Sequence, residues 1–393
     1  MYDSNPAAIV TGQTLRDASL QDTDAFTVVL DTYLDRQNAF VFGTTPAGIE
    51  HDGQVSNEAQ QGGGGGQRQQ RGSGGGFNLN WDGSWEVATT TDGEGWYAEM
   101  RIPFATLRYR GGGEQNWGLN FGRTIRRKNE QSVWAPLQRQ LNLYRVSLAG
   151  TLALQAPANR IFTISPYVLG DAFKDYEVVS PEADFGGQIG GDMKVGLTQS
   201  LTLDLTVNTD FAQAEVDDQQ INLTRFSLFF PEKRAFFLEN AGTFAVGSPR
   251  SSELFFSRRI GLSEGQEVPI RAGARVTGKV GNVQVGLLNI QTGALDAFDA
   301  TSGLTERVAP ANNFGVLRLS REMGNHTQFG GILVTRLNTN DGDDYNLTYG
   351  MDGRLGIGED LTLDGWAGLT TTPLADGAAA TGDGFNDGEY GFA

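Results

Sequence analysis

The chain has 393 residues, enough for two ordinary domains, and only 39% of them are apolar, below the usual ~45–50%. Its net charge of −17 argues against a nucleic-acid partner, which calls for a basic face. With no cysteine and only two histidines, it cannot build disulfides, a thiolate centre or a multi-histidine metal site. No apolar run approaches the ~20 residues of a membrane-spanning helix, but the strands of a membrane β-barrel need apolar residues only at alternate positions.

Residues 1–156 show the pattern of a partial, jelly-roll-like antiparallel β-sandwich. Short apolar runs between turn residues predict strands at residues 26–30, 38–43, 117–121 and 132–135. Asp92-Gly93 predicts a tight hairpin turn between the aromatic stretches 81–87 and 95–103. Residues 61–76 consist of Gly, Gln, Arg and Ser, so we expect a disordered loop within this domain.

From residue 157 onward, apolar side chains occupy alternate positions, as in the strands of an outer-membrane β-barrel. The alternation is clearest in residues 201–208, 271–280 and 345–357, and it breaks at Leu287-Leu288. About nine strands are predicted, and the connections between them alternate between short turns and long polar loops. This layout indicates that residues 157–393 form an incomplete transmembrane-type barrel. A soluble sandwich or jelly roll remains the alternative, because any half-buried antiparallel strand alternates.

Residues 208–260 depart from this alternation. Phenylalanines crowd the segment, with basic residues among them: Phe226, Phe229, Phe230, Phe236, Phe237, Phe244, Phe255 and Phe256, with Arg225, Lys233, Arg234, Arg258 and Arg259. We expect a plug-like segment folded into the barrel, with residues 231–234 as a turn or helix start. An aromatic girdle at the membrane interface is the alternative.

Two groups of side chains in the predicted sandwich are candidates for ligand binding. Trp81 and Trp85, beside the Gly-rich loop, could stack on sugar rings, although a structural role in the core is slightly favoured. Four aspartates in predicted turns could ligate Ca²⁺: Asp22, Asp24, Asp31 and Asp35. Their spacing matches no defined calcium loop and turns are rich in aspartate, so we expect no cofactor.

Asp210 and Glu215 are the candidates for catalysis, because two carboxylates at a fixed separation can hydrolyse a glycosidic bond. Glu232 and Glu239 follow them in the same region. Solvated acids facing the polar lumen of a barrel are favoured over this hypothesis. We therefore expect a protein that is not an enzyme, and a glycoside hydrolase if it is one.

Two parts of the chain resemble known families. Residues 19–52, with WEVATTTDGEGWYAEMRIPFATL and WGLNFGRTIRRKNEQSVWAP, resemble the family-nine carbohydrate-binding-module-like domain. Residues 208–260, with the unusual strings DFAQAE and FFPEKRAFFLE, resemble an uncharacterised barrel family that commonly follows that domain in outer-membrane proteins. In such proteins the equivalent of residues 2–6 lies well inside the sandwich, so we expect that the start of the sandwich and the end of the barrel are missing here.

The resemblance implies an outer-membrane location, contact with lipid and a carbohydrate or glycan-like ligand. The sandwich would be either periplasmic or surface-exposed. Three functions stay open: glycan binding or transport in carbohydrate utilisation, hydrolysis of O-glycosyl compounds, and a structural or assembly role in the outer membrane. The sequence does not indicate an oligomeric state.

Overall fold

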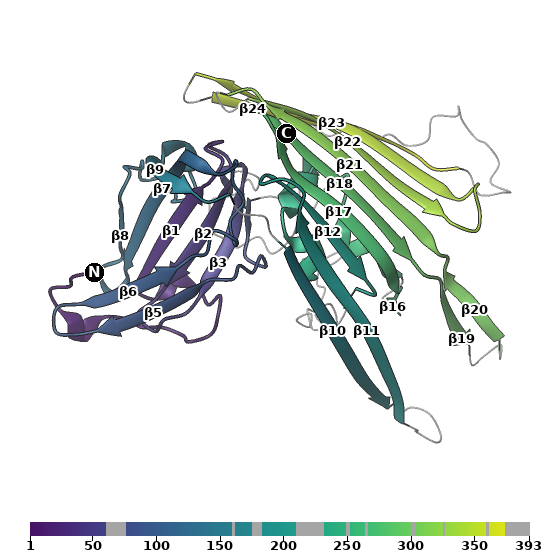
Figure 1. Cartoon of the computed structure of the whole chain (residues 1–393), viewed down its shortest axis with the longest axis horizontal. Coiled ribbons are helices and arrows are strands. Elements are labelled where there is room, and N and C mark those ends of the chain that lie inside the picture. The colour runs from purple at the N-terminus through teal and green to yellow at the C-terminus, as the bar shows by residue number, and fades with distance from the viewer. Residues whose placement is uncertain are drawn as a thin grey trace.

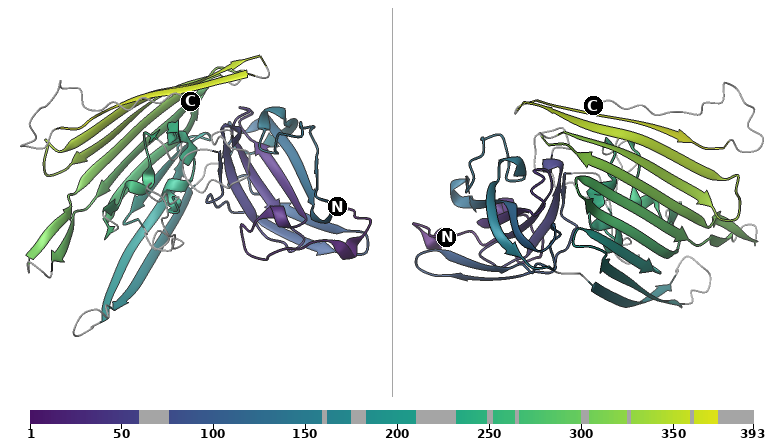
Figure 2. Two further views of the ribbon diagram at one scale, coloured as in Figure 1. Left: turned by 180° about the vertical axis from the view of Figure 1, so that it is seen from behind. Right: turned by 45° about the horizontal axis from the view of Figure 1, so that its top comes forward.

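The computed structural model describes residues 1–59, 76–158, 162–174, 183–209, 232–248, 252–263, 266–299, 304–324, 327–358 and 361–373. These residues form two antiparallel β-units: a sandwich, and a nine-stranded sheet that curls into half a barrel (Figure 1). A short segment of helical turns lies on the concave side of the half-barrel (Figure 2). The predicted all-β fold class is confirmed. Within the described ranges, no helix is long and apolar enough to cross a membrane.

The sandwich is built on a seven-stranded sheet in the order β4-β3-β2-β1-β7-β8, with β9 paired to the first half of β7. Its strands are β1 (Ala25–Asp31), β2 (Ala39–Thr44), β3 (His51–Ser56), β4 (Gly76–Asn78), β7 (Gly113–Ile125), β8 (Glu130–Val133) and β9 (Gly150–Ala156). Five 3-10 turns accompany them: η1 (Pro6–Ala8), η2 (Leu20–Asp22), η3 (Asn57–Ala59), η4 (Arg126–Lys128) and η5 (Val146–Leu148).

The hairpin of β5 (Glu86–Thr91) and β6 (Trp96–Arg101) forms the second layer, and its turn at Asp92-Gly93 is the predicted one. The prediction for residues 61–76 is wrong at Gly76, which begins β4 and pairs with Ser56. The rest of that predicted loop lies outside the described residues.

Both faces of the large sheet are covered by apolar side chains. Phe42 belongs to the core beneath the β5–β6 hairpin, whereas its neighbour Val41 packs against Val146 on the opposite face. Both are fully buried. This explains why β1 and β2 are continuous apolar runs rather than alternating ones.

The half-barrel has the strand order β10-β11-β12-β17-β18-β21-β22-β23-β24. Its strands are β10 (Phe162–Lys174), β11 (Ala183–Gly196), β12 (Leu201–Val207), β17 (Ile270–Val280), β18 (Val283–Thr292), β21 (Asn312–Glu322), β22 (Gln328–Asn338), β23 (Tyr345–Ile357) and β24 (Leu361–Thr371). Three small hairpins extend from the connections: β13 (Gly247–Ser248) with β14 (Ser252–Glu253), β15 (Leu262–Ser263) with β16 (Gln266–Glu267), and β19 (Leu295–Asp299) with β20 (Leu304–Ala309).

The strand register aligns one apolar residue from every strand in a single row across the convex face. This outer row consists of Phe162, Val195, Leu203, Val276, Leu287, Leu317, Leu333, Tyr349 and Leu369. Leu287 is 47% exposed and Tyr349 is 48% exposed. Polar side chains that alternate with the row are buried on the concave face, including Asp204, Arg275 and Arg318. The polarity of the sheet is therefore inverted relative to a soluble sandwich.

The described part of the predicted plug packs on the concave face. It comprises residues 232–248 and 252–260, with α2 (Ala235–Leu238), η6 (Ala241–Phe244) and η7 (Ser257–Arg259), and is called the plug segment below. Phe236, Phe237 and Phe244 share a buried core with Leu288 and Ile290 of β18. The alternation breaks at Leu287-Leu288 because Leu288 meets the plug segment while Leu287 faces outward. Three further predicted aromatics, Phe226, Phe229 and Phe230, lie outside the described residues.

Candidate functional site

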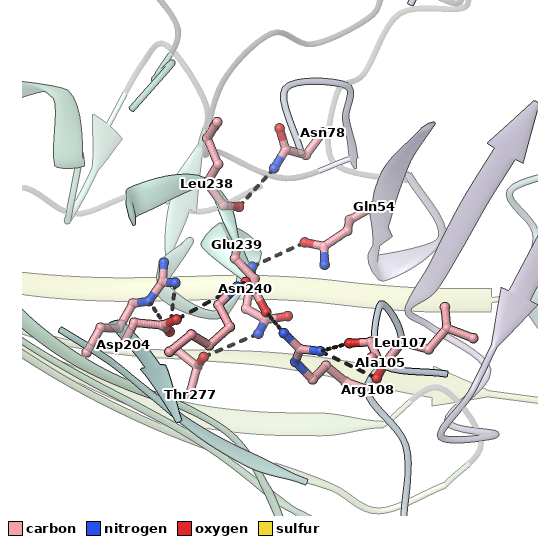
Figure 3. Close-up of polar contacts among 12 residues, drawn as sticks. Gln54, Asn78, Ala105, Leu107, Arg108, Asp204, Leu238, Glu239, Asn240 and Thr277 are labelled. Atoms are coloured by element: carbon pink, nitrogen blue, oxygen red, sulfur yellow. Dashed lines mark hydrogen bonds and ion pairs between the residues drawn. The ribbon is translucent and has the colours of Figure 1, made fainter. Parts of the chain in front are cut away.

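The sandwich, the plug segment and the half-barrel meet at one junction, where polar side chains from all three come together (Figure 3). The sandwich contributes Arg108 and the loop between β1 and β2. The plug segment contributes the stretch from Leu238 to Asn240, and the half-barrel contributes Lys194 of β11, Asp204 of β12 and Thr277 of β17. We take this junction as the candidate functional site because it is the place where the three parts can influence one another.

The Glu239 carboxylate is the charged centre of the junction. It accepts a hydrogen bond from Arg108 of the sandwich at 2.6 Å and forms an ion pair with Lys194 of β11. Arg275 of β17 lies beyond, 2.9 Å from Asp204 of β12. Burial alone would raise the pKa of the Glu239 carboxyl, but Arg108, Lys194 and Arg275 together hold it well below its usual range. Glu239 therefore stays ionised and ties the plug segment to both neighbours.

Neutral hydrogen bonds reinforce the same contact. Asn78 donates from Nδ2 to the Leu238 carbonyl at 3.1 Å, and Asn80 donates in the same way to the Glu232 carbonyl at 3.0 Å. The backbone N–H of Asn240 donates to Gln54 Oε1 at 3.2 Å. The sandwich thus satisfies backbone groups of the plug segment that have no partner within such a short helical turn.

A second charged group lies where β17 ends. Lys279 Nζ is 2.5 Å from Asp35 of the β1–β2 loop and 2.7 Å from Glu322 at the end of β21, and it lies 5.2 Å from the ring centre of Tyr33. Burial raises the pKa of Asp31 to about 7, and the neighbouring Asp35 carboxylate adds to this rise. Asp31 accepts hydrogen bonds from the backbone amides of Asp35 and Arg36, so it fixes the loop that reaches Lys279.

A cavity of about 70 Å³ lies between these two charged groups. Hydroxyl and amide side chains predominate in its wall, which includes Gln54 from the sandwich, Asn240 from the plug segment and Thr202 from the half-barrel. Tyr33 and Phe40 supply aromatic surface. All three parts of the molecule contribute to this wall.

The plug segment also carries an ion pair of its own. Glu232 and Arg234, both almost completely buried, approach to 2.7 Å, and Arg234 donates further hydrogen bonds to the carbonyls of Ser257 and Ile260. Burial alone would raise the pKa of Glu232, but the hydrogen bonds and charge of Arg234 and the hydrogen bond from Ser257 lower it. Glu232 and Glu239 are therefore bound anions, which are poorly suited to donate a proton as a general acid.

The comparisons with known proteins concern the second half of this arrangement. Residues 157–290 match a family model described as a domain of unknown function, DUF5916. The matched stretch runs from β10 to β18 and includes the plug segment, so the Glu239, Lys194 and Lys279 side chains of the junction all lie within it. No curated protein matches the chain.

The structure places both predicted sugar-stacking tryptophans in the sandwich core. Trp81 packs against Phe40, with ring centres 5.2 Å apart, and Trp85 packs against Phe42 at 5.3 Å. Trp81 is 6% exposed and Trp85 is 5% exposed, so neither indole face is open to a ligand. This placement favours the structural interpretation of the two residues.

Trp134 is the solvent-exposed tryptophan, and sequence reasoning did not single it out. It is 56% exposed, whereas each of the other five is buried. Its ring packs edge-on against Phe121 and covers Gly150, where a Cβ atom would collide with the indole. The sequence offered one signal: Trp134 comes shortly after the polar run Glu130-Gln131-Ser132, which the structure places in β8, a strand exposed along its whole length.

The remaining predicted site residues do not form a site among the described residues. Asp24 is buried and accepts a hydrogen bond from the Arg126 amide, while the Asp22 side chain is 81% exposed. No group of three or more acidic or histidine side chains that could hold a metal ion occurs in the described ranges, and the calcium hypothesis stays a prediction. Asp210 and Glu215 lie outside the described residues. Sequence reasoning named Glu239 and Arg234 in the plug but missed Arg108, Lys194 and Lys279.

Proposed function

We propose that this chain is part of an outer-membrane β-barrel protein that binds or transports a glycan-like ligand. In this proposal the half-barrel contacts lipid, the plug segment fills its lumen, and the sandwich closes one end. The single observation that carries the proposal is the outer row, an unbroken band of apolar side chains from all nine strands of the half-barrel.

The energetic argument rests on which face of the sheet is exposed. In water, exposing the outer row while burying ionised side chains on the opposite face would be unfavourable on both counts. In a bilayer the same arrangement is favourable, because lipid covers the apolar face and the ionised groups pair inside. Arg318 pairs with Asp352 and Arg354 with Asp364 on the concave side. Most strands of the half-barrel have 10 to 14 residues, enough for a tilted crossing of ~9–11 residues.

The position of the sandwich supports a periplasmic location for it. Its ion pair with the half-barrel joins Asp35 to Lys279, which also pairs with Glu322, and both half-barrel residues lie at strand ends next to the short turns 281–282 and 323–327. The longer connections, including the β19–β20 hairpin, extend from the far end of the sheet (Figure 1). Outer-membrane barrels have short turns on the periplasmic side and long loops outside.

The ligand class is supported by two observations of different kinds. The sandwich resembles the family-nine carbohydrate-binding-module-like domain in the strings given above. It also presents Trp134 with an exposed indole, and such a ring can stack on the apolar face of a sugar. We favour binding or transport over hydrolysis, because Glu232 and Glu239 of the plug segment have lowered pKa values and fixed partners. Burial raises the pKa of the third described carboxyl of the segment, Glu253, to about 7, but its charged neighbour is Arg259 rather than the second carboxylate that glycoside hydrolysis needs.

Nitroxide labelling of the full-length protein in outer-membrane vesicles tests the membrane assignment. The chain has no cysteine, so single labels need no background substitutions. A label at Met351→Cys, next to the outer row on β23, should collide with dissolved oxygen far more than with a water-soluble nickel complex. A label at Thr348→Cys, on the concave face of the same strand, should show a lower ratio. Equal access of the nickel complex to both labels would overturn the proposal.

A further inference from the structure

The junction cavity has a wall whose chemistry defines a class of ligand. We propose that it is a binding site for a small neutral polyhydroxylated molecule, about one sugar ring in size, held between the sandwich, the plug segment and the half-barrel. The inference deepens the proposed ligand-handling function and rests on it, but it does not depend on the membrane location.

Three polar groups on residues that line this cavity have no hydrogen-bond donor role within the described part of the chain. The Tyr33 hydroxyl, the Thr202 hydroxyl and the Gln54 side-chain amide nitrogen donate to no other group within the described part of the chain, although their residues line the cavity. Thr202 is only 3% exposed. Hydroxyl and amide groups in proteins are normally hydrogen-bonded, so these three leave hydrogen-bonding capacity around one cavity that water or a ligand can take.

The volume of the cavity indicates the size of the molecule that could bind to these groups. One water needs ~10–15 Å³ of such volume, so a cavity of about 70 Å³ holds about five waters or one compact polar molecule. A ring bearing several hydroxyls can replace a water cluster of this size while keeping its hydrogen bonds. Tyr33 and Phe40 add aromatic surface for the C–H groups of such a ring.

The charges around the cavity indicate that the ligand is neutral. Asp35 is paired with Lys279 at 2.5 Å, and Arg108 is paired with Glu239 at 2.6 Å. A charged ligand would have to displace one member of these buried pairs and leave the other without a partner, which is costly. A neutral polyol leaves both pairs intact and uses only the hydroxyl and amide groups.

The location gives the site a consequence beyond binding. Its wall contains Tyr33 from the sandwich, Asn240 from the plug segment and Thr202 from the half-barrel, so a ligand contacts all three at once. A ligand that binds only the assembled junction stabilises it by mass action. Occupancy should therefore hold the sandwich and the plug segment in place.

Saturation-transfer NMR on the detergent-solubilised full-length protein tests the site directly. The probes are D-glucose, D-xylose and myo-inositol, with D-glucuronate and D-glucosamine as charged counterparts of the same ring. We expect binding of at least one neutral probe, slower amide exchange at residues 35–38 and 240–243 when it is bound, and weaker binding of the charged rings. Failure of every neutral probe to bind, or tighter binding of a charged one, would overturn the inference.

Two conservative substitutions locate the site. Tyr33→Phe and Thr202→Val remove hydroxyls that make no hydrogen bond in the described chain, so they should leave the fold unchanged. Together they should weaken binding about tenfold or more. Thr206→Val, buried on the same face of β12 but outside the cavity wall, is the control and should bind normally. Its hydroxyl contacts that of Thr209 at 3.1 Å, so the stability of this variant is measured alongside its binding. Unchanged binding by the double variant, or loss of binding on Trp134→Ala instead, would place the ligand elsewhere. Either result leaves the nitroxide test of the membrane assignment standing.

Discussion

At the scale of single residues, His51 is a buried base held in its neutral form. It is 3% exposed, its ring stacks on Phe77 with centres 6.2 Å apart, and its Nδ1 atom has no hydrogen-bond partner. Burial lowers the pKa of His51 to about 4. Its contribution to stability is complete above the unfolded-state pKa of ~6.5 and is lost as the pH falls toward 4. The difference between the pKa values of the unfolded and folded states corresponds to a loss of about 3 kcal/mol of stability at low pH.

We therefore predict that His51→Phe removes this part of the pH dependence. The free energy of unfolding in urea, measured at pH 7.5 and 4.5, should fall less in the variant than in the native chain. Because the chain has only two histidines, the NMR signal that disappears in His51→Phe identifies this ring. A titration of that signal near pH 6.5 would contradict the prediction.

Glu232 gives a second prediction at this scale. Replacing it with Ala leaves Arg234 buried at 2% exposure without its carboxylate. Removing one partner of a buried ion pair costs about 3–5 kcal/mol, so the free energy of unfolding should fall by that order. Glu86→Ala removes the exposed partner of Arg101 and should change stability by less than about 0.5 kcal/mol. Similar losses in the two variants would mean that the buried pair contributes no more than a surface pair.

The tryptophans illustrate what residue type alone could not predict. Trp81, Trp85 and Trp134 are all aromatic residues near turns, and nothing in their type separates core from surface. Burial is decided by which strand faces the β5–β6 hairpin, and that depends on pairings between strands far apart in sequence. The polar residues of β8 that precede Trp134 offered the only local signal for it, and a strand of four residues is too short to make that signal decisive.

At the scale of elements, alternation predicted the faces of the half-barrel well. Leu201, Leu203 and Leu205 are more exposed than Thr202, Asp204 and Thr206 along β12, as the pattern indicated. The plug was predicted because its phenylalanines do not alternate, and Phe236 and Phe237 are buried on the concave face. Alternation fails where both faces are covered, at Leu288 and throughout β1 and β2.

The outer row predicts that a charged substitution is tolerated on the concave face of the half-barrel but not on its convex face. Leu369 belongs to the row and Thr370, its neighbour on β24, lies on the concave face. Arginine at a lipid-facing position costs about 2–4 kcal/mol at the middle of a bilayer and less toward its surface. Leu369 is two residues from the end of β24, so Leu369→Arg should reduce folding into vesicles of the full-length protein by less than that full cost. Thr370→Arg should have little effect. The folded fraction can be measured by its altered gel migration before heating, and equal fractions in the two variants would argue against lipid contact.

At the scale of the whole molecule, the contacts that join the sandwich to the rest had no sequence signal. Arg108 and Glu239 are 131 residues apart, and Asp35 and Lys279 are 244 apart. Periodicity describes how one strand faces its own sheet, but not which charged residue meets another across two folded units. The junction therefore became visible only when the strands were placed in space.

Arg108 tests whether this junction holds the molecule together. Arg108→Ala leaves the buried Glu239 carboxylate with Lys194 but removes its link to the sandwich. Since a retained cation limits the penalty, the loss should be smaller than the ~3–5 kcal/mol of an unpaired buried charge, but large enough to raise amide exchange about tenfold or more. The increase should appear at residues 78–80 and 238–240, on both sides of the contact. Arg101→Ala, on the exposed side of the β5–β6 hairpin, should leave exchange there unchanged. Faster exchange on one side alone would mean that the sandwich and the plug segment are held independently, and that ligand binding between them could not couple the two.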